Sequence, residues 1–168
     1  NKILIIGGSG SNTSLTTSVA TGAGLAPTHV TGGAISSVNF TLFDAVYMPT
    51  STRDVSGGIT AADVALVNGR AADLANFVNS GGGLAAFAQN VAGGYGWFPL
   101  GTLQTVDFGG GGANGILLTA AGAAILAPSA TAVQPFHTGF TGPAGLVGMD
   151  VLATESGSLR RPLIIGGL

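Results

Sequence analysis

Short, mainly apolar runs with glycine or proline at one end constrain the fold of this chain more than any other feature. The first is Ile3 to Ile6, which is continuous and is followed by Gly7-Gly8, and another is Phe43 to Met48, which is apolar except for Asp44 and stops at Pro49. Leu84 to Ala88 is a third such run and follows a glycine triplet. Runs of this length and composition are typical of strands that are buried on both faces of a parallel sheet.

Stretches with helical spacing separate these runs. Small and apolar residues recur at helical intervals over Thr13 to Leu25. The best helix extends from Thr60 through Val78 and carries Asp63 in its first turn. Other expected elements are strands over Thr28–Ile35, Ile116–Thr119, Gly145–Thr154 and Leu163–Ile165, a helix over Ala120–Leu126 and a long ordered loop over Gly93–Gly112.

This alternation of strands and helices predicts an α/β fold with a mostly parallel sheet and helices on both faces, that is, a three-layer sandwich. The length of 168 residues fits one hydrophobic core. We therefore predict a single α/β domain over residues 1–168.

Charged side chains are scarce. Asp, Glu, Lys and Arg make up 7% of the chain, whereas soluble domains typically carry about 25%. Thr, Ser, Asn, Gly and Ala must then cover the surface, and a net charge of −2 opposes self-association very little. The five cations are scattered in the sequence, so we expect no binding to nucleic acid: Lys2, Arg53, Arg70, Arg160 and Arg161.

Two features favour an extracellular or cell-surface location. The chain has no cysteine, which suits an oxidising exterior and excludes disulfides, thiolate metal sites and cysteine nucleophiles. It starts at Asn1 without an initiator Met and runs almost at once into an apolar segment, so we expect that an upstream segment was removed; a cleaved secretory signal would produce this start, and so would trimming of the chain to its ordered domain. No apolar stretch approaches the roughly 20 residues that a membrane-spanning helix needs. We expect no membrane span in this chain.

Two strings carry a resemblance to a known superfamily. FDAVYMPTS, from Phe43, and LANFVNSGGGLAAFAQ, from Leu74, resemble the core of class I glutamine amidotransferase-like domains, which are flavodoxin-like α/β proteins. The match covers about residues 3–90. ILLTAAGAAILAP, from Ile116, and RPLIIGG, from Arg161, look like the distal half of extracellular, non-catalytic members.

The resemblance implies the fold without the chemistry. Catalytic members carry a nucleophilic cysteine at the turn after the strand that is Leu84 to Ala88 here. Gln89 and Asn90 occupy that turn, and neither side chain can form an acyl intermediate. His137 in the string PFHTGF has no glutamate nearby to complete the pattern. We therefore expect a protein that is not an enzyme.

The glycine-rich turn after Ile6 is the place where a phosphate would bind. The third glycine of the dinucleotide fingerprint is missing, and the first carboxylate in the chain is Asp44, too distant for a ribose contact. We expect no cofactor. A triad of Ser9, His137 and Asp150 can be written down, but no spacing selects it.

Metal ligands do not pair at helical spacing either. A calcium site that uses loop carbonyls with Asp54, Asp107 or Asp150 stays open at this point.

Tyr95, Trp97 and Phe98 lie together in the glycine-rich segment, where they could form a subunit interface, stack on a sugar or plug the core. Our leading hypothesis is a non-catalytic structural protein that associates with copies of itself in a filament, tube or surface layer, with these three residues as the candidate interface. The alternative is a ligand- or carbohydrate-binding module, or a degenerate hydrolase, at the carboxyl end of the sheet. Its candidate pocket residues are Ser9, Ser11, Gln89 and Asn90.

Overall fold

The structure is a computed structural model of the whole chain. It describes residues 1–8, 11–52, 56–87, 94–98, 103, 105–107, 115–126, 138–141, 148–157 and 159–167. The chain groups into two compact units, Asn1–Pro99 and Leu100–Leu168, and each is treated by itself below. The single domain that the sequence predicts stays a prediction.

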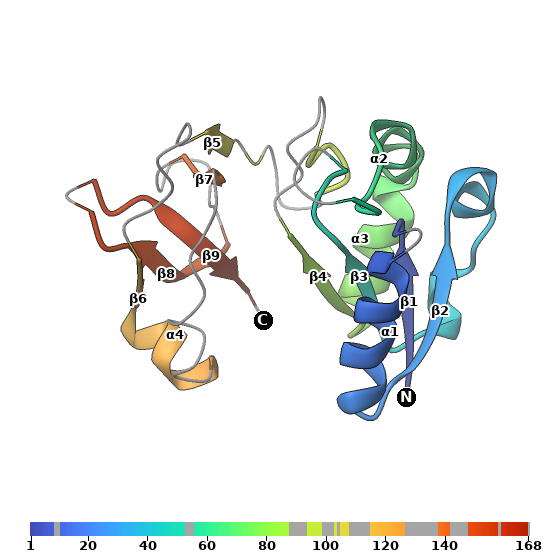
Figure 1. Cartoon of the computed structure of the whole chain (residues 1–168), viewed down its shortest axis with the longest axis horizontal. Coiled ribbons are helices and arrows are strands. Elements are labelled where there is room, and N and C mark those ends of the chain that lie inside the picture. The colour runs from blue at the N-terminus through green and yellow to red at the C-terminus, as the bar shows by residue number, and fades with distance from the viewer. Residues whose placement is uncertain are drawn as a thin grey trace. The chain divides into compact units, whose positions relative to one another are not determined.

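The first unit contains a four-stranded sheet in which every neighbouring pair is parallel (Figure 1). The strand order is β2-β1-β3-β4, so the chain adds β2 on one side of β1 and then β3 and β4 on the other side. The strands are β1 (Lys2–Ile6), β2 (Ala26–Val30), β3 (Ala45–Met48) and β4 (Gly83–Ala86). The predicted α/β fold with parallel strands is confirmed for this unit.

Helices connect these strands. They are α1 (Ser11–Gly22), the 3-10 helices η1 (Gly32–Ser36) and η2 (Phe40–Leu42), α2 (Ala61–Asn68) and α3 (Ala71–Asn79). α1 packs against β2, η1 against α2, and η2 against α3. α1 thus packs on the edge strand of the sheet, while the two 3-10 helices pack on α2 and α3.

Two predicted boundaries in this unit were wrong. The strand expected over Thr28–Ile35 ends at Val30, because Gly32 takes a φ of +55° and the chain turns into η1. The single helix expected from Thr60 to Val78 is two helices, which separate at Gly69 and Arg70. The side chain of Arg70 leaves the helix at this break and bonds to the segment after η1.

The core of the first unit centres on β1. Leu4, Ile5 and Ile6 are all buried, and successive strand residues point to opposite faces, so β1 is covered on both faces. This agrees with the continuous apolar run in the sequence. Further buried apolar side chains come from α1, β3, η1, η2, the loop before α2, the two helices that follow it and the segment after β4: Ala20, Ile35, Phe40, Val46, Met48, Ile59, Val64, Val67, Leu74, Phe77, Tyr95 and Trp97.

The second unit has antiparallel pairing throughout its described part. β5 (Thr105–Asp107) pairs with β7 (Thr138–Phe140), and a three-stranded sheet has the order β6-β8-β9. Its strands are β6 (Ile116–Leu118), β8 (Asp150–Glu155) and β9 (Pro162–Gly166), and α4 (Ala120–Ile125) follows β6.

The element types predicted from residue 116 onward are found in the second unit, but the parallel arrangement does not extend there. A short loop joins β8 to β9, and a loop of that length can only connect antiparallel neighbours. The segment expected as a long loop, Gly93–Gly112, contains the short strand β5.

Candidate functional site

The sequence places its alternative pocket where the parallel strands of the first unit end, here called the carboxyl edge. Ser9, Gln89 and Asn90 lie outside the described residues. Ser11 is the first residue of α1, and β4 ends at Ala86, so the elements that flank these positions do reach this edge. Of the triad written above, Ser9 and His137 are also outside the described part, and Asp150 begins β8 in the second unit.

A tight glycine turn follows β1 at this edge. Gly7 and Gly8 have φ values of +84° and +82°, which residues with a Cβ atom rarely adopt. The amide of Gly7 donates to the carbonyl of Val30 on β2 at 2.8 Å. A Cβ atom on Gly7 would lie 3.0 Å from Ile59, so the turn and Ile59 are packed against each other.

Ile59 reaches this position because the chain after β3 folds back on itself. Its amide donates to the carbonyl of Thr50 at 2.9 Å and its carbonyl accepts from the amide of Thr52 at 3.0 Å. The order of strands reverses between β1 and β3, which is where open α/β sheets bind their ligands. At this point the fully buried side chain of Ile59 lies against the turn after β1.

The buried carboxylate of Asp63 joins two loops at the same edge. One oxygen accepts from the amide of Gly32, just after β2, at 2.7 Å. The other accepts from the hydroxyl of Thr60 at 2.7 Å and from its amide at 3.3 Å, while the amide of Asp63 donates back to that hydroxyl. Both carboxylate oxygens therefore accept hydrogen bonds within the protein, and a negative charge in the first turn of α2 is favourable because it lies at the positive end of the helix dipole.

Sequence reasoning placed Asp63 correctly in the first turn of a helix but missed its bond to Gly32. That bond spans 31 residues of chain, and no local pattern signals it.

His29 on β2 forms a pair with a hydroxyl group of α1. Its Nε2 lies 3.0 Å from Oγ1 of Thr17. Nδ1 is buried and has no hydrogen-bond partner in the described part of the chain. Burial lowers the pKa of His29, and the nearby backbone of Gly7 opposes this only in part. The lowered pKa favours the neutral ring, which lies next to the hydroxyl of Thr17, and no carboxylate of the described residues bonds to it.

We expect the stability of the protein to fall in mild acid because of His29. The lowered pKa means that the unfolded chain takes up this proton more readily, so the free energy of unfolding decreases as the pH drops below about 6.5. Thermal melting at pH 7.5 and pH 5.5 measures the slope. His29→Gln, which keeps a polar group near Thr17, should show a smaller loss than the parent chain; an equal loss would contradict the assignment.

The aromatic candidates lie mainly in the core of the first unit. Tyr95 and Trp97 are only 8% and 2% exposed. Trp97 Nε1 donates to the carbonyl of Gly94 at 3.0 Å, and the Tyr95 hydroxyl donates to the carbonyl of Phe87 at 3.2 Å. This burial favours the core among the three alternatives for these two rings. Phe98 packs edge-on against Trp97 and is half-buried, so its contact with another molecule stays a prediction.

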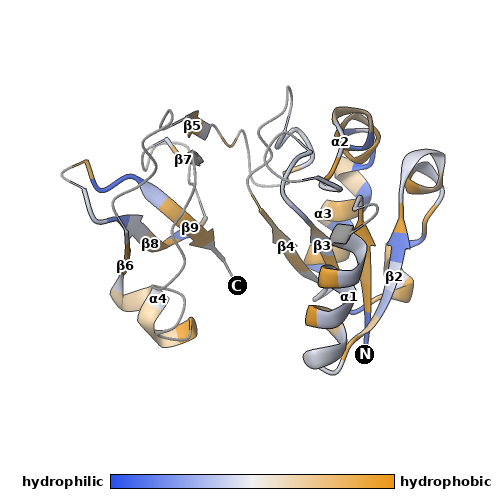
Figure 2. Cartoon of the chain, viewed as in Figure 1, coloured by the Kyte–Doolittle hydropathy of each residue, from blue (hydrophilic) through white to orange (hydrophobic). Residues whose placement is uncertain are grey.

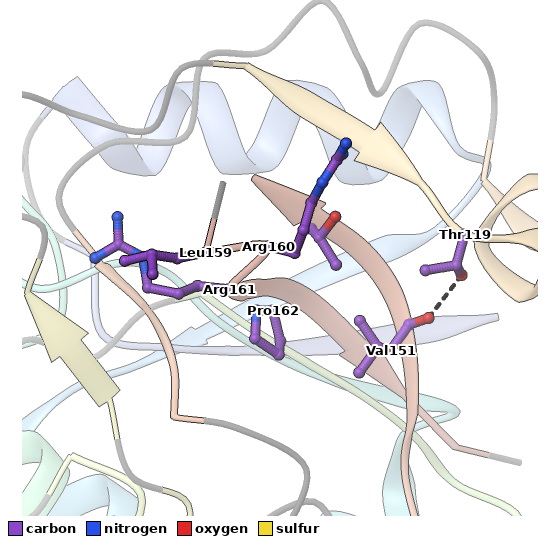
Figure 3. Close-up of a pocket in the computed structure, with 7 residues that line it drawn as sticks. Thr119, Val151, Leu159, Arg160, Arg161 and Pro162 are labelled. Carbon is purple, nitrogen blue, oxygen red and sulfur yellow. Dashed lines mark hydrogen bonds between the residues drawn. The ribbon is translucent and has the colours of Figure 1, made fainter. Parts of the chain in front are cut away.

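The second unit contains an open hollow that the sequence did not reveal (Figure 3). It has a volume of about 500 Å³ and is lined by Thr119 before α4, Val151 and Thr154 on β8, and residues 159–162 before and at the start of β9. The hydroxyl of Thr119 donates to the carbonyl of Val151 at 2.6 Å, which fixes one wall. The only trace in the sequence is the adjacent pair Arg160-Arg161.

Arg161 at the rim of this hollow forms an ion pair with Glu155. Its Nη2 donates to Oε2 of Glu155 at 2.8 Å, and its Nε and backbone amide donate to Oε1. Hydrogen bonds from Arg161 lower the pKa of Glu155, although burial acts in the opposite direction. The carboxylate of Glu155 is only 3% exposed and remains charged because Arg161 balances it.

Within the described ranges, no three His, Asp or Glu side chains converge as metal ligands, and no helix is long and apolar enough to cross a bilayer. Asp54, one of the calcium candidates, lies outside those ranges, while Asp107 and Asp150 stand at the end of β5 and the start of β8. Comparisons with protein-family models, with curated proteins and with solved structures found no match to this chain.

Proposed function

We propose that this chain is a non-catalytic structural protein of the cell exterior that associates with copies of itself in a filament, tube or surface layer. The observation that carries the proposal is the outward face of α1. None of its 12 residues is charged, and Leu15 and Val19 are 63% and 66% exposed. These two residues lie four apart and therefore share one face of the helix.

An exposed helix normally turns a polar face to solvent. Figure 2 shows apolar colour on α1, and the helix offers no charge that would oppose contact with a second apolar surface. Burying Leu and Val side chains is favourable by about 1.5 kcal/mol or more each. Repeated contacts of this kind between many copies would cover the uncharged surface that the composition predicts.

We further propose that the first unit has the three-layer, amidotransferase-like fold. Crossovers between parallel strands are right-handed almost without exception. With the order β2-β1-β3-β4, that rule puts α1 on one face of the sheet and α2 and α3 on the other. The parallel pairing and the resemblance from Phe43 through Gln89 both support this assignment.

Three observations support the absence of catalysis. Gln89 and Asn90 occupy the turn at which the catalytic members of the superfamily that the sequence resembles have their nucleophile. Ile59 lies buried against the turn after β1, at the position where open sheets bind ligands. The imidazole of His29 is paired with Thr17, and its second nitrogen meets no carboxylate in the described part of the chain.

The test is to remove the apolar face of α1 without weakening the helix. The double variant Leu15→Glu/Val19→Lys replaces the face with an ion pair at helical spacing and leaves the net charge unchanged. Losing about 3 kcal/mol of contact between copies should raise the critical concentration for assembly about a hundredfold. Light scattering over a concentration series, with electron microscopy of the same samples, measures this value.

A matched control places the same ion pair on α3. Ala72→Glu/Asn76→Lys changes two exposed residues at the same spacing and should assemble like the parent chain. If the parent chain remains a monomer at every concentration, self-association is wrong. Attention then passes to the alternative, ligand binding at Ser9, Ser11, Gln89 and Asn90.

A further inference from the structure

Arg160 is the one arginine of residues 100–168 whose charge the structure leaves unmatched among the described residues. Arg160 and Arg161 are the only Lys or Arg residues in that half of the sequence. Arg161 binds both carboxylate oxygens of Glu155. The guanidinium of Arg160 has no such partner in the described ranges, and Arg160 is one of the residues that line the hollow in the second unit.

The backbone holds Arg160 in an unfavourable conformation. Its φ of +49° is the only positive value among the described residues other than glycine. Side chains with a Cβ atom disfavour this region, and residues kept there against local preference concentrate at binding sites. The consequence is visible in Figure 3, where Arg160 and Arg161 extend in different directions from neighbouring positions. Both arginines line the hollow, but only Arg161 is paired with Glu155, so the turn leaves the charge of Arg160 available to a ligand there.

The walls of the hollow add an apolar surface beside this charge. Leu159 is 72% exposed, and Val151 and Pro162 contribute further aliphatic groups. The volume of about 500 Å³ is within the range that small-molecule sites occupy. Thr154 adds a side-chain hydroxyl to the lining.

We propose that this hollow binds a small organic anion, whose carboxylate or phosphate group pairs with Arg160 and whose apolar part lies against Leu159, Val151 and Pro162. An arginine guanidinium recognises either group through two parallel hydrogen bonds. A mostly apolar lining with one charged group to fix orientation is the usual composition of a ligand site. This binding does not depend on self-association.

Titration calorimetry with three aromatic probes tests the proposal on the full chain at concentrations below assembly. Benzoate and phenyl phosphate carry the required charge, and benzamide has the shape of benzoate without it. We expect saturable binding of at least one anion with a dissociation constant of about 1 mM or below, and at least tenfold weaker binding of benzamide. Preference between the two anions identifies the group that the site takes.

Arg160→Gly provides the sharpest variant because it should change binding and stability in opposite directions. Glycine adopts a positive φ without strain, so the melting temperature should rise by about 2–4 °C. Removing the guanidinium should weaken binding of the anion at least tenfold. Arg160→Lys, which keeps the charge, should bind more tightly than the glycine variant.

Lys2→Gln serves as the control, since it removes an exposed cation from the first unit and should leave the affinity unchanged. Absence of saturable binding by either anion, equal binding of benzoate and benzamide, or full affinity in Arg160→Gly would each overturn the proposal.

Discussion

Replacing Gly122 by alanine is expected to destabilise the second unit by about 3 kcal/mol. Gly122 lies in α4, where the helix packs directly on β8. A Cβ atom at this position would overlap the carbonyl oxygen of Leu152, a backbone atom that cannot rotate away. The helix would have to move off the strand. Chemical denaturation followed by circular dichroism measures the loss.

The hydroxyl of Thr119 fixes α4 in the same place, because it donates to the carbonyl of Val151 and accepts from the amide of Gly122 at 3.0 Å. Gly22→Ala in α1 is the control, since its Cβ atom would meet nothing within 4 Å. Alanine is the better helix former by about 1 kcal/mol, so this variant should be neutral or more stable. An unchanged unfolding midpoint in Gly122→Ala would mean that α4 does not rest on β8.

Removing the side chain of Arg70 should have an effect of similar size in the first unit. Its Nη1 donates to the carbonyl of Ile35 at 2.8 Å and its Nη2 to the carbonyl of Val38 at 2.9 Å. The guanidinium also lies 4.7 Å above the ring of Phe40. Arg70→Ala leaves two carbonyls without their donor and should cost about 3–4 kcal/mol in the free energy of unfolding.

Two further variants separate these contacts from the ion pair that Arg70 makes with Asp73. The carboxylate of Asp73 is half exposed, and ion pairs of that kind contribute less than about 1 kcal/mol. Asp73→Asn should therefore be mild. Arg70→Lys keeps the charge but not the fork that reaches both carbonyls, so it should lose most of what alanine loses. Equal losses for Asp73→Asn and Arg70→Ala would assign the stability to the ion pair instead.

Local patterns in the sequence predicted the strands β1, β3 and β4 of the first unit and the start of α2. The run Ile3 to Ile6 is hydrophobic at every position because β1 is buried on both faces. Thr60 and Asp63 stand three residues apart and form the capping box that such a pair favours. The glycines before Leu84 mark the point where α3 ends and β4 begins.

Features that depend on distant parts of the chain could not be read in the same way. Helical spacing continues through Gly69, so the break that releases Arg70 toward Ile35 left no periodic signal. The three residues of β5 are too few for a pattern, and the pairing with β7 joins segments more than 30 residues apart. Positive φ at Arg160 is a property of the folded turn, not of its residue type.

In the candidate sites too, local patterns could be predicted from the sequence, but contacts between distant segments could not. Sequence reasoning could group Tyr95 with Trp97, but only packing decides that both rings are buried. The parallel sheet was enough to predict that Ser11 and Gln89 come after strands that end at the same edge. The approach of Ile59 to Gly7 could not be predicted, because it depends on how the chain folds after β3.

The bonds of Asp63 and Arg70 give this cysteine-free chain a set of non-covalent crosslinks. They tie Asp63 to Gly32, and Arg70 to Ile35 and Val38, so each closes a loop of more than 30 residues. A disulfide would close such loops permanently and only under oxidising conditions. These crosslinks open when the unit unfolds and form again when it refolds, whatever the redox state of the surroundings.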